Sequence, residues 1–145
     1  MLFRSGFLFA HKTVAVLGIA FKQRTNDIRD SSALKVIEGL LGRGVAVIKL
    51  YDPMAATEAR HYYDVAKNPL FDKISYHDSV KSALDGTDAL FIATDWEEFR
   101  GLSRTIEQHT QKPYLVIDGR RMIPDYAELT DLGYRYLAVG APFIG

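Results

Sequence analysis

The sequence predicts an α/β domain built on a three-layer, doubly wound, mostly parallel six-stranded sheet. Apolar runs of four to six residues alternate with helical patterns along the whole chain, which is typical of this class. The run at 89–93 is apolar throughout, as expected of a strand covered on both faces. The 145 residues are 48% hydrophobic, which is enough for one domain with a sizeable core. We therefore expect a single Rossmann-like domain, with its first and fourth strands adjacent at the centre.

Six short apolar runs are the predicted strands. Several of them end at residues that mark the start of a turn, among them Gly18, Asp52 and Gly119. In order along the chain, the expected strands are 13–17, 45–50, 73–76, 89–93, 114–117 and 134–139.

The segments between these runs carry helical patterns preceded by capping residues. Asp52, for example, is interpreted as the N-cap of a helix that has Pro53 as its first residue. In order, the expected helices are 33–41, 54–66, 79–84, a short helix with Trp96 and Phe99, 103–109, and a last one from 124–125. The expected caps are Ser31, Ser32, Asp52, Asp78, Thr94 and Asp95.

Composition excludes several classes of function. The 18 basic and 18 acidic residues cancel, so no overall field attracts nucleic acid or a membrane surface. The chain has no cysteine, which excludes a disulfide scaffold and a cysteine nucleophile supplied by these residues. Its four histidines lack metal-ligand spacing, so no metal site is expected. No apolar stretch approaches the ~18 residues of a membrane span, and the first residues lack the long apolar core of a signal peptide. The expected location is therefore cytoplasmic.

Positive charge is concentrated near the start of the chain. Residues 1–50 hold eight basic and three acidic residues, whereas residues 51–100 hold five and ten. The excess includes Lys22, Arg24 and Arg29, in the loop after the first strand. In a parallel sheet this loop lies beyond the carboxyl end of the strand and beside a helix N-terminus, where anions bind. The alternative, in which these cations are merely solvated, stays open.

The loops after the first, fourth and fifth strands are expected to face one crevice, because these strands are neighbours in such a sheet. They bring together aromatic side chains, cations, and hydroxyl or carboxylate groups. This set suits a phosphorylated ligand with a flat base or a sugar. The residues are Phe21, Lys22, Arg29, Thr94, Asp95, Trp96, Asp118, Gly119, Arg120 and Arg121.

Individual residues of this edge have competing interpretations. Gly18 stands alone after the first strand, and a backbone cradle for a dinucleotide pyrophosphate needs three glycines. Asp52 is either a ribose acceptor or a helix cap, and the cap is favoured. Trp96 is either a core anchor or a ligand contact, and Arg120 is either a ligand contact or the partner of Asp118.

At these residues the sequence resembles the C-terminal domain of the UDP-glucose/GDP-mannose dehydrogenase family. The resemblance is carried by VAVLGIAFKQRTNDIRDSSA at 14–33, Tyr-Asp-Pro at 51–53, DALFIATDWEEF at 88–99 and Asp-Gly-Arg at 118–120. It implies a domain that closes over a nucleotide sugar, most often a UDP-sugar, in an NAD-dependent oxidoreductase of polysaccharide biosynthesis. By resemblance, Phe21, Lys22 and Arg120 contact the nucleotide sugar, and Arg29 reaches toward NAD.

The chain also departs from the complete enzymes of this family. It lacks a G-x-G-x-x-G motif and a cysteine, and has no room for the other two domains. The expected division is an N-terminal extension at 1–11 and a nucleotide-sugar-binding domain at 12–145, inactive alone and without catalytic residues.

Three functional alternatives stay open. The chain is a separate binding module, a subunit of a split dehydrogenase completed by a partner chain, or a gene remnant. A homodimer is also compatible with the sequence. A partner would need an exposed apolar surface, and Leu2, Phe3, Phe7, Leu8 and Phe9 are the candidates.

Overall fold

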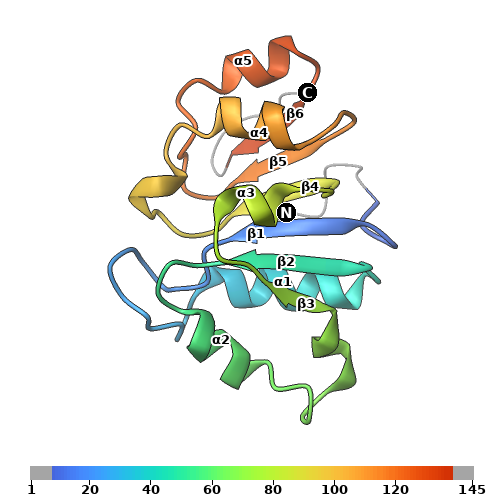
Figure 1. Cartoon of the computed structure of the whole chain (residues 1–145), viewed down its shortest axis with the longest axis vertical. Helices are drawn as coiled ribbons and strands as arrows, with labels where there is room; N and C mark the ends of the chain where they lie inside the picture. Colours follow the sequence, from blue (N-terminus) through green and yellow to red (C-terminus); the bar gives the residue numbers. More distant parts are fainter. Residues whose placement is uncertain (1–7, 139–145) are drawn as a thin grey trace.

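The computed structural model of the chain describes residues 8–138. Six strands alternate with five α-helices and two 3-10 helices in this part (Figure 1). In chain order the elements are β1 (Thr13–Leu17), α1 (Ser32–Gly42), β2 (Val47–Tyr51), α2 (Ala56–Tyr62), η1 (Pro69–Lys73), β3 (Ile74–Tyr76), α3 (Val80–Leu84), β4 (Ala89–Ile92), η2 (Glu97–Phe99), α4 (Ser103–His109), β5 (Leu115–Asp118), α5 (Tyr126–Asp131) and β6 (Arg135–Ala138).

All six strands form one sheet in the order β3-β2-β1-β4-β5-β6, and every pair is parallel. The residues of β1 are in register with both central neighbours, since Val14 pairs with Ile48 of β2 and with Ala89 of β4. The chain runs outward from β1 to β3, then crosses back to β4 and runs outward the other way. The predicted doubly wound sheet, with its first and fourth strands adjacent, is confirmed.

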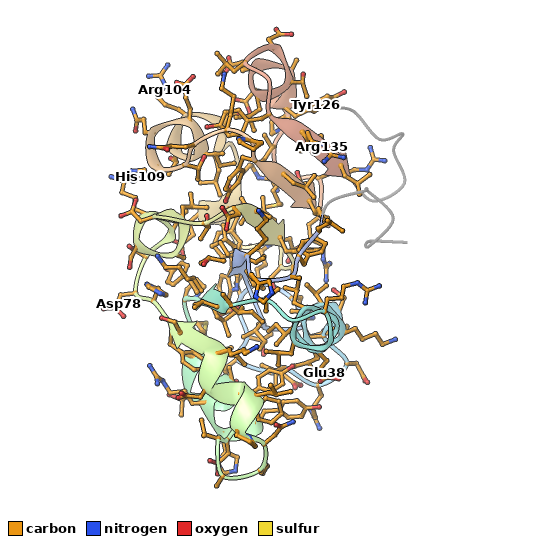
Figure 2. The ribbon with its side chains drawn as sticks, turned by 90° about the vertical axis from the view of Figure 1, so that its right-hand side faces the viewer. Glu38, Asp78, Arg104, His109, Tyr126 and Arg135 are labelled. Carbon is orange, nitrogen blue, oxygen red and sulfur yellow. The ribbon has the colours of Figure 1, made fainter. Side chains whose placement is uncertain are left out.

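Helices cover both faces of the sheet. In Figure 1, α3 and α4 lie in front of the strands and α1 lies behind them. The turned view in Figure 2 shows the same layers, with Glu38 of α1 on one side and Asp78, Arg104 and His109 on the other. Every residue of β4 and β5 is buried, which explains why β4 and the first three residues of β5 are apolar.

The second helix is shorter than predicted. It was expected at 54–66 with Asp52 as its N-cap, but α2 spans Ala56–Tyr62 and its N-cap, Ala55, makes no side-chain capping bond. Asp52 does accept hydrogen bonds from the backbone N–H groups of Met54 and Ala55, both at 2.9 Å. It therefore closes the turn before the helix. The helix ends early because Asp64 accepts a hydrogen bond from the backbone of Ala66 and forms a competing turn.

Other caps also differ from the prediction. Ser31 is confirmed as the N-cap of α1, where it accepts a bond from the Ala33 backbone. The third helix is capped by Ser79 and not by Asp78. Thr94 and Asp95 do not cap the η2 turn, because both side chains bond to the loop after β1 instead.

The expected apolar patch near the start of the chain is wrong for one residue. Phe9 is buried and packs 6.2 Å, centroid to centroid, from Phe91 of β4, whereas Leu8 is 79% exposed. The other patch residues (2, 3 and 7) and the end of the predicted sixth strand (139) lie outside the described residues. None of the helices in the range 8–138 is long and apolar enough to cross a membrane.

Candidate functional site

The loops after β1, β4 and β5 meet at the carboxyl-end edge of the sheet, as the sequence predicts. On the left of Figure 1, the long loop after β1 passes close to the segment that follows β4. Side chains from the β4 and β5 loops bond directly to the backbone of the β1 loop at three points, which are Ala20, Phe21 and Gln23. We call residues 18–31 the binding loop. The conformation of this loop determines which side chains at this edge are available to contact a ligand.

The binding loop leaves β1 through a turn that requires glycine. Gly18 has φ +95°, and a Cβ atom there would come within 2.3 Å of the Thr94 hydroxyl oxygen. That hydroxyl donates a 2.9 Å hydrogen bond to the backbone carbonyl of Ala20. The close approach of the β4 loop therefore depends on the missing side chain.

Asp52 is the buried anchor of the binding loop. One carboxylate oxygen accepts hydrogen bonds from the backbone N–H groups of Ile19 and Ala20, at 2.8 and 3.0 Å, and from the indole N–H of Trp96, at 3.1 Å. The other oxygen holds the turn before α2. Because five donors of the chain already surround this 5% exposed side chain, the structure favours anchoring over ribose binding. Trp96 is correspondingly buried, as the core interpretation requires.

Lys22 and Phe21 stand out from the binding loop toward solvent. Lys22 is exposed, and it makes no hydrogen bond or ion pair with any other residue in the described range. Phe21 is 46% exposed, so part of its ring is accessible beside Lys22. The backbone here is fixed even so, since the Phe21 N–H donates to the Asp27 carbonyl at 2.7 Å.

Arg120 reaches from β5 across β4 to the binding loop. Its guanidinium donates to the carbonyl oxygens of Ala93, at 3.3 Å, and Phe21, at 3.2 Å. The predicted alternative, pairing with Asp118, holds only for the backbone: the Arg120 N–H donates to the Asp118 carboxylate at 3.3 Å, whereas the guanidinium does not contact it. The Asp118 carboxylate is fully buried and accepts bonds from the backbone of Met122 and from the Tyr136 hydroxyl, at 2.9 and 2.8 Å.

The contacts of Arg120 use two of the five N–H donors that a guanidinium carries. The remaining N–H groups have no partner among the described residues. Lys22 and Arg120 thus lie at the same edge, because the second contact of Arg120 is to the residue immediately before Lys22. The edge therefore offers an ammonium group and part of a guanidinium group to an anion.

Arg29 belongs to the same loop but is already paired. Its guanidinium donates to both carboxylate oxygens of Asp27, at 3.0 and 2.8 Å, while its side chain stays 86% exposed. The hydrogen bonds from Arg29 lower the pKa of Asp27 to about 2 and raise the pKa of Arg29. Arg29 is thus paired with Asp27 near the end of the binding loop, and it makes no contact with Lys22 that the described residues show.

Other chemistry-bearing groups lie elsewhere. A cavity of about 650 Å³ occupies the opposite, amino-end edge, where His109 pairs with Asp85 at 3.0 Å. His77 bridges the hydroxyls of Ser75 and Ser82, at 2.9 and 2.6 Å. Within residues 8–138, no three His, Asp or Glu side chains gather as metal ligands would.

Sequence reasoning missed the carboxylates that hold the binding loop. Asp95 accepts a 3.0 Å hydrogen bond from the Gln23 backbone, and Asp27 orients Arg29. The sequence does not reveal these two roles, because a carboxylate at a strand end or in a loop is equally suited to capping a helix. The usable signal is that the fourteen-residue loop between β1 and α1 has many backbone N–H groups and few local acceptors.

Comparisons with known proteins agree with the geometry. The profile of the UDP-glucose/GDP-mannose dehydrogenase family, UDP binding domain, matches residues 15–125. UDP-glucose 6-dehydrogenase TuaD of Bacillus subtilis is 35% identical over 92% of this chain, and AglM of Haloferax volcanii, also a UDP-glucose 6-dehydrogenase, is 41% identical over 84%. The chain covers only 27% and 26% of these two relatives.

Solved structures show the same relation. A UDP-glucose dehydrogenase from the archaeon Pyrobaculum islandicum superimposes with a TM-score of 0.68 at 28% identity, over 92% of this chain and 26% of that one. A UDP-D-ManNAc dehydrogenase from Pyrococcus horikoshii gives 0.66 at 28% identity, over 92% and 27%. The chain belongs to the UDP-glucose/GDP-mannose dehydrogenase family, in which it corresponds to the C-terminal, UDP binding domain.

Proposed function

We propose that the domain binds a nucleotide sugar, with a UDP-sugar as the expected ligand, at the carboxyl-end edge of its sheet. The observation that carries the proposal is Lys22, an exposed ammonium group that has no partner among residues 8–138 and stands on a loop whose backbone is otherwise fixed. A solvated surface lysine would not need such a support. A diphosphate is the ligand group that matches it.

Each candidate residue has a distinct role in this proposal. Lys22 pairs with the diphosphate. Arg120 adds its outer N–H groups to the phosphate or sugar while its inner ones keep the binding loop in place. Phe21 offers the exposed part of its ring to the base or the sugar.

NAD is the cofactor that the family resemblance implies, with Arg29 as the residue facing it. The chain does not fit a complete NAD site by itself. Gly18 is the only glycine of the binding loop, residues 18–31, and the Asp52 carboxylate is surrounded by donors of its own chain. Oxidation by these residues alone is also not expected, because they include no cysteine to act as nucleophile.

A second candidate function is a subunit of a split dehydrogenase, completed by a partner or by another copy in a homodimer. It is favoured by the coverage of the relatives, of which the chain spans about a quarter. The exposed Leu8 is the described part of a surface on which a partner could dock. A gene remnant without activity is the remaining alternative.

Isothermal titration with UDP-glucose and with UDP tests the proposal. Lys22→Ala should weaken binding by about 1.5–3 kcal/mol, the range for a hydrogen bond to a charged group. Arg29→Ala should change it little, since that side chain is paired with Asp27. Lys35→Ala, which removes an exposed lysine of α1, is the matched control for loss of a positive charge.

Two outcomes contradict the proposal. The first is no binding by the wild-type domain at millimolar nucleotide, which favours a remnant or a partner-dependent site. The second is an equal loss from all three substitutions, which indicates a diffuse attraction to positive charge. NADH formation from UDP-glucose by the pure domain would overturn the expected inactivity.

A further inference from the structure

The two peptide groups on either side of Lys22 are each held by a side chain from another strand. The carbonyl of Phe21, which is joined to the Lys22 nitrogen, accepts from Arg120 at 3.2 Å. The N–H of Gln23, which is joined to the Lys22 carbonyl, donates to Asp95 at 3.0 Å. Both contacts connect residues more than 70 positions apart in sequence. The backbone of Lys22 is therefore fixed from β5 and from β4 at once.

We propose that Asp95 is a positioning residue for Lys22, and that through this contact it raises the affinity of the site for a nucleoside diphosphate. The inference rests on the proposed function. A lysine side chain loses much rotamer freedom when it binds a phosphate. If its backbone were also free to move, that further entropy would be lost on binding. Asp95 removes this cost before the ligand arrives.

Asp95 is part of a three-residue support at the end of β4. Thr94 donates to the Ala20 carbonyl, and Trp96 donates to Asp52, which in turn holds the start of the binding loop. Thr94 and Trp96 are buried, whereas Asp95 is only partly buried. Asp95 is therefore the member of this support that can be replaced without opening the core.

Charge and positioning make opposite predictions for Asp95. A carboxylate close to the phosphate site repels the ligand, so an effect of charge alone predicts that removing it tightens binding. Positioning predicts that removing the acceptor weakens binding. Asp95→Asn keeps an acceptor oxygen and loses the charge, while Asp95→Ala loses both.

The test is titration of UDP into wild type, Asp95→Ala, Asp95→Asn and the Lys22→Ala/Asp95→Ala double variant. Asp95→Ala should bind about three- to tenfold more weakly, the effect of one hydrogen bond of ordinary net strength. Asp95→Asn should bind within about twofold of wild type. In the Lys22→Ala background, Asp95→Ala should cause no further loss, because the residue it positions is gone. Asp131→Ala, which removes an exposed carboxylate at the end of α5, is the control.

Amide hydrogen exchange supplies a readout that does not depend on the ligand. In Asp95→Ala the Gln23 amide should exchange faster, while amides of the central strands keep their protection and so show that the fold is intact. Unchanged or tighter UDP binding by Asp95→Ala overturns the inference, as does an equal loss in Asp95→Asn. Additive losses in the double variant also overturn it. If wild type binds no UDP, the proposed function fails, and an unchanged Gln23 exchange rate in Asp95→Ala would separately refute the holding contact.

Discussion

Replacing Asp52 by alanine tests whether one buried carboxylate fixes the binding loop. The substitution leaves five donors without their acceptor, four of them buried: the backbone N–H groups of Ile19, Ala20, Met54 and Ala55 and the indole N–H of Trp96. A buried donor left unsatisfied costs about 1–3 kcal/mol, and water entering the space offsets part of the sum. We therefore expect the free energy of unfolding to fall by about 3–5 kcal/mol, at the upper end for a single substitution.

Urea unfolding followed by circular dichroism measures this loss. In a thermal melt, a domain of this length loses about 3 °C of melting temperature per kcal/mol. The melting temperature of Asp52→Ala should therefore drop by roughly 10–15 °C. Asp64→Ala is the control, because Asp64 is exposed and accepts a local bond from Ala66 only; it should stay within about 0.5 kcal/mol. Asp52→Asn should recover little, since its amide nitrogen must face donors whichever way it turns. A loss below about 1 kcal/mol in Asp52→Ala would refute the anchoring role.

Three further predictions concern the backbone and titration. Gly18→Ala should destabilise the domain by at least about 2 kcal/mol through its φ of +95° and a Cβ contact at 2.3 Å, whereas Gly42→Ala, with open space around it, should be neutral or stabilising in the same urea assay. Carbon-detected NMR should find the pKa of the Asp27 carboxyl at about 2, and Arg29→Ala should raise it only part of the way to 3.8, because the side-chain hydrogen bond from Arg29 is lost while the backbone N–H of residue 29 still donates to Asp27. Burial, with a smaller effect of the Lys49 charge, lowers the pKa of His77, so the neutral ring is favoured in the fold. The stability this contributes should be complete above pH ~6.5 and decline as pH falls through the lower folded pKa; an unfolding free energy that is flat from pH 7.5 to 5 would contradict it.

The architecture could be predicted from sequence because its signals are local and repeated. Each strand of the central four is an apolar run that ends at a turn residue, and parallel strands joined by helices allow few topologies. β1 has the predicted bounds, and the described bounds of the other strands differ from those predicted by one or two residues. The start of β2, for example, moves from 45 to Val47 because Val45 is buried in the turn before it.

The contacts of the candidate site were only partly predictable. The strand order predicts that Lys22 and Arg120 share an edge. In the structure, Arg120 donates to the carbonyl of Phe21, the residue before Lys22. That Asp52 and Asp95 turn inward to the binding loop does not follow, because the choice depends on which backbone N–H groups lack a partner after folding. The acceptors for these groups are 32 to 72 residues away in sequence. No local pattern contains that information.

The origin of these holding contacts bears on what the domain can do by itself. Asp52, Thr94, Asp95 and Arg120 all lie within the matched domain, so the shape of the binding loop does not depend on the remaining three quarters of the relatives' length. Under the proposed function, affinity for an anion at Lys22 would arise from this local preorganisation. Oxidation would need a nucleophile and a cofactor site that these residues do not supply. The proposed function therefore predicts that binding and chemistry are separable, and a measured affinity of this domain for UDP would report the contribution of the loop alone.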